Sequence, residues 1–180
     1  MAKLFDEITP ALREFIAAQP VFFVGTAPSG DDGHVNVSPK GGANLFHVTG
    51  PLGFAYVDLM GSGIETIAHL KENGRIVVMF CAFSGPPRIV RLHGRGVPML
   101  AGTPEFAGLA PCFPEYVSAR AIIRIALDRV SDSCGFGVPR MHIEGERDDL
   151  IKWAERKGPD GIAAYWADTN VDSLDGLPGI

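Results

Sequence analysis

The stretch His34-Val-Asn-Val-Ser-Pro-Lys-Gly-Gly42 decides how this chain is interpreted. Residues 34–38 alternate polar side chains with valines, as in a strand with one polar and one apolar face. Pro39 has no N–H to donate and is expected to end the strand. Lys40 then carries a positive charge past the strand end, and the glycines at 41–42 let the backbone approach a ligand closely. The polar face carries His34, Asn36 and Ser38.

Two interpretations of this stretch stay open from its residues alone. A polar strand face, a lone lysine and two glycines suit the seat of a phosphorylated ligand. The same pattern is also typical of an ordinary hairpin whose outer face meets water.

The composition predicts a single globular domain over residues 1–180. The chain has 180 residues, of which 46% are hydrophobic and 21% charged, which is typical of a folded domain with a sizeable core. The three cysteines are widely spaced and odd in number, which argues against a disulfide framework and a structural zinc site, and we expect no metal.

Charge and hydropathy limit the partners and the compartment. The formal net charge is −5, whereas duplex-binding domains usually carry a basic excess, so nucleic acid is not expected as a partner. The longest apolar run, 76–83, is too short to span a bilayer. Acidic residues interrupt the N-terminus before a signal-like apolar run develops. We therefore expect a cytoplasmic protein with no membrane partner.

Hydrophobic periodicity predicts a mainly β chain with a few helices. The segment 119–131 fits either type, and its β-branched content favours a strand. Short turns, together with side chains that alternate between two faces along each segment, favour a barrel-like antiparallel sheet. The expected strands span 21–27, 34–38, 46–49, 54–59, 75–83, 88–97 and 119–131. The expected helices span 5–18, from about 61 to 72, 103–110 and 148–157, with Pro10 a possible true start of the first and Thr9 its cap.

The segment from Gly61 to Thr66 follows a strand and opens a helix. Ser62 and Glu65 have the spacing of a capping box, and a Rossmann fingerprint is rejected because its third glycine is missing. A helix start with free N–H groups and two hydroxyls can hold a phosphate. Simple capping explains Ser62 equally well, and Glu65 has the wrong charge beside a phosphate.

The segment 88–97 places Arg91, His93 and Arg95 on one strand face. This cationic stripe is either a solvated outer face or a surface that meets an anion or another subunit. A general base could come from His34, His47 or His93, although a structural role is expected for each.

The order of three motifs resembles the FMN-binding split-barrel proteins, the pyridoxamine 5′-phosphate oxidase-like family. The motifs are His34 to Gly41, Gly61 to Arg75 (Gly-Ser-Gly-Ile-Glu-Thr-Ile-Ala-His-Leu-Lys-Glu-Asn-Gly-Arg) and Arg88 to Gly94. The resemblance covers about residues 10–131. It implies a six-stranded antiparallel split β-barrel with flanking α-helices, a homodimer, and FMN in a groove between subunits.

The resemblance also implies which residues contact the flavin. The strand matching 34–40 lies along the cofactor with its basic end at the phosphate, 54–58 supplies backbone contacts, and the next helix start supplies phosphate ligands. The better-known oxidases carry basic residues at positions 65 and 66, and Arg91 is a candidate to restore that charge. The implied contacts are Asn36, Val37, Ser38, Lys40, Tyr56, Val57, Asp58, Ser62, Glu65, Thr66 and Arg91.

The function expected from the resemblance is that of an FMN-dependent oxidoreductase acting on a small molecule. The tail has Trp166 but no lysine or arginine after Lys157, so pyridoxamine phosphate is not the expected substrate. The alternatives are a non-catalytic dimer that binds a flavin or a haem-type ligand, and a deazaflavin-dependent reductase. The tail, about residues 159–180, is expected to dock on the partner subunit.

Overall fold

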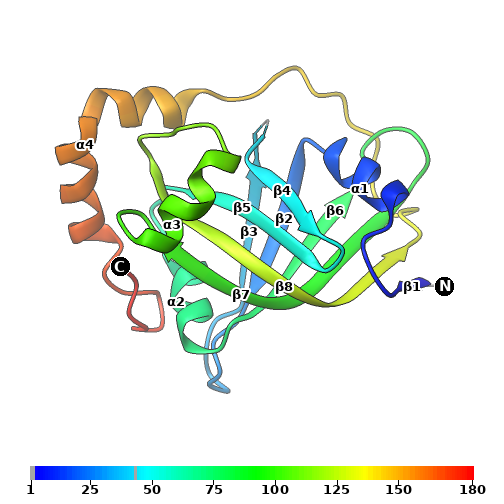
Figure 1. Cartoon of the computed structure of the whole chain (residues 1–180), viewed down its shortest axis with the longest axis horizontal. Helices are drawn as coiled ribbons and strands as arrows, with labels where there is room; N and C mark the ends of the chain where they lie inside the picture. Colours follow the sequence, from blue (N-terminus) through cyan, green and yellow to red (C-terminus); the bar gives the residue numbers. More distant parts are fainter. Residues whose placement is uncertain (1–2, 43) are drawn as a thin grey trace.

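The computed structural model describes residues 3–42 and 44–180, and these form an antiparallel sheet of eight strands curled into a half-closed barrel (Figure 1). The strands are β1 (Lys3–Phe5), β2 (Val21–Thr26), β3 (Asn36–Gly41), β4 (Phe46–Gly50), β5 (Gly53–Leu59), β6 (Arg75–Cys81), β7 (Ile89–Leu100) and β8 (Ala119–Ser133). The helices are α1 (Pro10–Ala17), α2 (Glu65–Glu72), α3 (Pro104–Leu109), α4 (Asp149–Thr169) and the short 3-10 helix η1 (Ala110–Cys112).

The strand order confirms a split barrel. Hydrogen-bonded neighbours run β3-β2-β6-β7-β8-β5-β4, and β1 pairs separately with β8. The two ends of this order, β3 and β4, do not pair with each other among the described residues, and this gap is the split of the barrel. The described residues form eight strands, and not the six that the family resemblance implied. Seven of them match the strand segments expected from the sequence, and residues 3–5 add a short eighth strand.

Pro39 does not end its strand, contrary to the sequence prediction. It lies inside β3 and is opposite Phe23 of β2. Proline is tolerated there because β3 is an edge strand, so one side of the residue has no ladder to complete. The exposed fraction of Val37 is 65%, so the valine face meets solvent and the polar face turns toward the barrel.

The helix starts show one correct and one wrong prediction. Thr9 caps α1, and its hydroxyl accepts a hydrogen bond from the Leu12 N–H at 3.3 Å. No side chain caps α2, which begins at Glu65 after Ile64, so the capping box of Ser62 is not formed. The stop of α2 is as expected, because Gly74 adopts a φ of +71° after the last turn.

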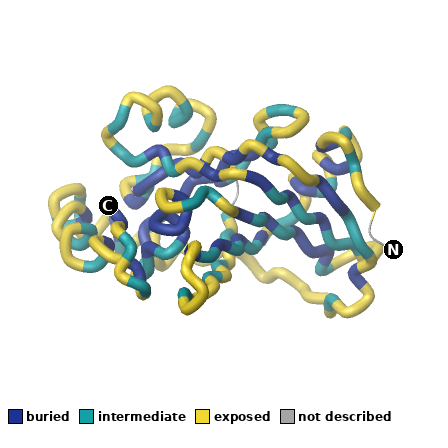
Figure 2. The backbone as a smooth tube through the Cα atoms, turned by 90° about the horizontal axis from the view of Figure 1, so that it is seen from below, coloured by how far each residue is buried: buried dark blue, intermediate teal, exposed yellow. Residues whose placement is uncertain are grey.

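The core fills the interior of the barrel, and α1 and α2 both contribute to it. Figure 2 shows buried backbone along the middle of the strands and exposed backbone in the loops and in much of α4. Alternation along the strands sends every second side chain inward, and the helices add one apolar stripe each. The largest buried members include Leu12, Ile16, Phe22, Phe54, Tyr56, Ile67, Phe80, Leu92 and Ile123.

The last helix, α4, is longer than predicted and bends at Gly158, whose φ of +66° interrupts the helical backbone before Pro159. Its residues Ala154 and Ile162 are buried against Met60, which follows β5. This packing places the first turn of α4 beside the split of the barrel (Figure 1). No helix in the described part of the chain is long and apolar enough to cross a membrane.

Candidate functional site

A half-open cavity of about 470 Å³ lies at the split of the barrel, between β3, the end of β5 and the start of α2. This volume falls within the range of small-molecule and cofactor sites. The wall combines hydroxyls, charged groups and apolar side chains. Its lining includes Ser38, Lys40, Leu45, Val57, Leu59, Met60, Ser62, Glu65, Thr66, Arg120 and Leu150.

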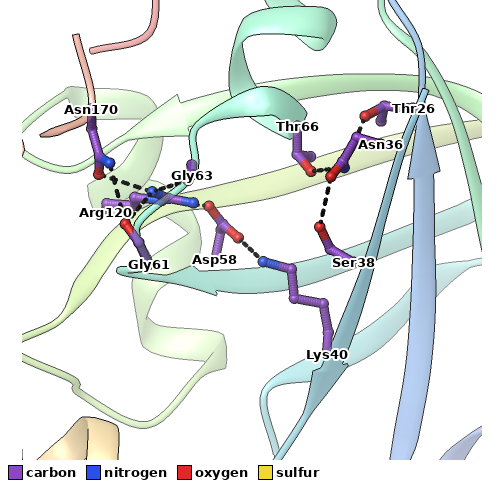
Figure 3. A network of polar contacts seen from close by, with 10 residues as sticks. All are labelled: Thr26, Asn36, Ser38, Lys40, Asp58, Gly61, Gly63, Thr66, Arg120 and Asn170. Carbon is purple, nitrogen blue, oxygen red and sulfur yellow. Dashed lines mark hydrogen bonds and ion pairs between the residues drawn. The ribbon is translucent and has the colours of Figure 1, made fainter. Parts of the chain in front are cut away.

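A buried carboxylate lies behind this cavity and binds two cations (Figure 3). The Lys40 Nζ lies 2.5 Å from Asp58 Oδ1, and the Arg120 Nε donates to Asp58 Oδ2 at 2.8 Å. Burial alone would raise the pKa of the Asp58 carboxyl, but the charges of Lys40 and Arg120 outweigh it, so this pKa lies below its ordinary value of 3.8. The three groups together keep one unit of positive charge beside the cavity.

The guanidinium of Arg120 holds the loop between β5 and α2 in place. Its Nη1 donates to the carbonyl of Gly63 at 2.8 Å and to the side-chain oxygen of Asn170 at 2.9 Å. The Asn170 amide in turn donates to the carbonyl of Gly61 at 3.2 Å. Because guanidinium N–H groups point in fixed directions, these bonds fix the loop that forms one wall of the cavity.

A second polar chain lies on the β3 side of the cavity (Figure 3). The Asn36 amide donates to Thr66 Oγ1 at 3.1 Å and to Thr26 Oγ1 at 3.3 Å, while the Ser38 hydroxyl donates to Asn36 Oδ1 at 3.1 Å. The Thr66 oxygen therefore accepts, and its own proton is left to donate elsewhere. Thr26 continues the chain to the buried His69, whose Nδ1 lies 3.0 Å from its hydroxyl.

The last residues of the chain cover the start of α2. We call residues 170–180 the C-terminal strap. The N–H of Leu174 donates to Glu65 Oε1 at 3.2 Å, and Asp175 pairs with the His34 ring at 2.6 Å. The strap thus contacts its own chain, and the expected contact with a partner subunit stays a prediction.

The structure gathers most of the predicted contacts at this cavity. Six of them line it: Ser38, Lys40, Val57, Ser62, Glu65 and Thr66. Asn36 and Asp58 lie directly behind the lining and orient it through the hydrogen bonds described above.

Three predicted contacts lie away from the cavity of their own chain. Val37 faces solvent on the other side of β3. Tyr56 is buried inside the barrel, where burial and the nearby Asp58 raise the pKa of its hydroxyl well above 10.0. Arg91 donates to the Ser133 hydroxyl at 3.1 Å, between β7 and β8. Two residues of the cationic stripe, Arg91 and Arg95, bind different partners, because Arg95 donates to the backbone carbonyl of Asn73 at 2.6 Å.

The three candidate bases have other neighbours. His34 is held by Asp175, and the His47 ring lies 5.0 Å from the ring of Phe113. Burial lowers the pKa of His93, and the charge of Arg129 lowers it further. The structural role expected for each of these residues stays a prediction.

Sequence reasoning missed Arg120 and Asn170. Arg120 opens the apolar run of β8, and a single charged residue next to such a run was the signal available. Asn170 comes after a helix that was predicted to end at residue 157. Their partners lie 50 or more positions away in the chain, so no local spacing predicts the contact.

A second, more apolar cavity of about 590 Å³ lies under α3 and η1, on the outer face of β5 and β8. Val57 lines both cavities. The lining of the second includes the aromatic residues Phe106, Phe113 and Tyr116.

The fold and the cavity define a split-barrel protein with a mixed polar and apolar site at its split, and comparisons agree. The family model described as pyridoxamine 5′-phosphate oxidase matches residues 8–134. The pyridoxamine 5′-phosphate oxidase family protein ustO of Aspergillus flavus is 40% identical over 196 aligned residues, which cover all of this chain and 78% of that protein. The chain therefore belongs to the pyridoxamine 5′-phosphate oxidase family.

Solved structures share the fold at low sequence identity. HupZ from Group A Streptococcus has a TM-score of 0.51 at 19% identity, and the match covers 68% of this chain and 91% of the HupZ chain. An FMN-binding protein from Syntrophomonas wolfei has a TM-score of 0.50 at 16% identity, with 67% and 82% covered. Both likenesses support the split barrel.

Proposed function

We propose that this protein is a flavin-dependent oxidoreductase that uses FMN and acts on a small molecule other than pyridoxamine phosphate. The observation that carries the proposal is the cavity at the barrel split, where hydroxyls, a lysine and a helix start meet apolar side chains. Membership of the family and the FMN-binding protein with the same fold support it.

The polar end of the cavity fits the phosphate and the ribityl chain. Lys40 supplies a positive charge, and Thr66 has a hydroxyl proton left to donate because Asn36 already donates to its oxygen. The first N–H groups of α2 have no partner within the helix and point out of its N-terminus. These groups would hold the anionic end of the cofactor.

The apolar end of the cavity fits the flat ring system. Val57, Leu59 and Met60 provide a surface on which a ring can rest. When bound, the flavin supplies the transfer of a hydride or of electrons. The chain's own residues would orient the ring, exclude water from one of its faces and hold its phosphate.

The functional unit that we propose is a homodimer. The cavity is only half-closed by one chain, and the family resemblance implies a groove between subunits. Sedimentation should therefore give twice the mass of one chain, and a monomeric mass in the presence of bound FMN would refute the dimer.

A non-catalytic ligand-binding protein is the second candidate, and Glu65 favours it. A carboxylate in the cavity wall weakens the attraction for a phosphate. A haem-type ligand could then occupy the groove in place of FMN. A deazaflavin-dependent reductase is a separate alternative, in which a deazaflavin would occupy the groove.

Anaerobic reduction separates the two candidates. The protein is loaded with FMN, freed of unbound flavin and mixed with a reduced nicotinamide or a reduced deazaflavin. Bleaching of the bound flavin, followed by its reoxidation with an electron acceptor, is expected for an oxidoreductase. Bound FMN that no reductant bleaches would favour the non-catalytic candidate.

A further inference from the structure

The carboxylate of Glu65 is held in the cavity wall by one hydrogen bond and lies close over Gly63. One oxygen accepts the Leu174 N–H of the C-terminal strap at 3.2 Å. The other folds back over Gly63, so closely that a Cβ at that glycine would lie 2.3 Å from it. Glycine at position 63 thus leaves room for the carboxylate beside the helix start.

The strap that holds Glu65 is itself anchored at several points. Asp175 binds both the ring and the backbone N–H of His34, at 2.6 and 2.8 Å. Lys71 donates to the carbonyl of Gly179 at 2.5 Å, and Asn170 is fully buried against Arg120. Because these anchors come from the loop before β3, from α2 and from β8, the strap and the Glu65 carboxylate that it binds are held beside the cavity.

The charges around the cavity then cancel. Among the lining residues that the structure describes, the charged ones are Lys40, Arg120 and Glu65. Asp58 neutralises one of the two cations, and Glu65 offsets the other. A phosphate monoester carries about 1.5 to 2 negative charges at neutral pH, and it would meet a wall with no net positive charge.

We propose that Glu65, positioned by the C-terminal strap, is a specificity-determining residue that selects against dianionic phosphate monoesters in this cavity. This inference rests on the proposed flavin site and specifies which ligand charge the site favours. The Glu65 charge lowers the affinity of the cavity for FMN, whereas a flavin that lacks the terminal monoester is not affected by this repulsion. FMN would therefore bind as an exchangeable ligand and not as a permanently held group.

The variant Glu65→Gln tests this inference. Gln has nearly the same shape and keeps an oxygen to accept the Leu174 N–H, so the strap stays in place while the charge is removed. Glu72→Gln is the matched control, because Glu72 lies on the same helix but does not line the cavity. Dissociation constants are measured for FMN and for riboflavin, which has the same ring and ribityl chain but no phosphate.

The expected result concerns the ratio of the two dissociation constants. Glu65→Gln should tighten FMN binding by about tenfold and leave riboflavin within about twofold, because only the phosphate responds to the lost charge. Glu72→Gln should change neither. A ratio that is the same in the wild type and in Glu65→Gln would overturn the inference while leaving the flavin site standing. Absence of binding by both flavins to all three proteins would overturn the proposed function, and the inference with it.

Discussion

Lys40 of β3 and Asp58 of β5 form an ion pair of 2.5 Å across the split of the barrel, although their strands stand near opposite ends of the hydrogen-bonded order. Next to Asp58, the Val57 N–H donates to the Leu45 carbonyl at 2.8 Å and extends the β4–β5 ladder on one side of the split. The lysine expected to serve a phosphate therefore also joins the two sides of the fold. The proposed phosphate contact and the closure of the barrel therefore depend on the same side chain.

Asp58 is the group whose loss should destabilise the fold most. Asp58→Asn leaves the buried Arg120 without its anion, and an unpaired buried charge of this kind costs about 3–5 kcal/mol. Urea unfolding should show this loss in the free energy of unfolding. The control Asp148→Asn breaks an exposed pair with Lys152 and should cost about 0–1 kcal/mol. Equal losses in the two variants would contradict the role given to Asp58.

Arg120→Lys tests whether geometry or charge matters at this position. Lysine keeps the charge but cannot reach Asp58, Gly63 and Asn170 at the same time. The free energy of unfolding should fall by about 2–4 kcal/mol. Arg124 is exposed on the same strand, and its change to lysine should have little effect. A stable Arg120→Lys variant would show that the loop does not depend on the guanidinium.

Lys40→Ala should weaken FMN binding by about 1.5–3 kcal/mol, because it removes a charge-assisted hydrogen bond. Lys152→Ala is the control, since Lys152 lies on α4 with an exposed side chain. Titration of each variant with FMN, followed by flavin fluorescence, gives the affinities. Unchanged affinity in Lys40→Ala would refute the contact. Riboflavin affinity should be nearly unaffected.

The buried His69 should make stability depend on pH. Burial lowers the pKa of His69 from 6.5 in the folded protein, so the unfolded chain binds more protons once the pH falls below about 6.5. The stabilisation is present above that pH and is lost as the pH falls through the lower folded pKa. Glutamine at this position does not titrate. The free energy of unfolding of His69→Gln should therefore change less than that of the wild type between about pH 7 and about pH 5. Parallel profiles would contradict this assignment.

Local patterns predicted the central strands well. The β2–β3 hairpin, the strand at 119–133 and the stop of α2 at Gly74 all follow from side-chain alternation and from one residue with positive φ. Pro39 misled the prediction because the sequence does not show that β3 is an edge strand. Gly158 and Pro159 hid the second half of α4, since both normally end a helix.

The candidate site was only partly accessible from sequence. Ser38, Lys40 and Thr66 lie in local patterns that suit a phosphate, and the structure brings them to one cavity. Arg120 lies 62 positions from its partner Asp58, and Leu174 lies 109 positions from its partner Glu65. Such contacts depend on how β8 and the C-terminal strap pack, and no spacing within one segment encodes that packing.

Equilibrium dialysis of FMN against the wild type and Ser38→Trp tests the central claim most directly. Ser38 lines the cavity on an edge strand, and an indole there would fill it, while circular dichroism confirms that the variant is folded. We expect one flavin per chain for the wild type and none for Ser38→Trp. Flavin held equally by both proteins would contradict the claim that the cavity at the barrel split is the flavin site.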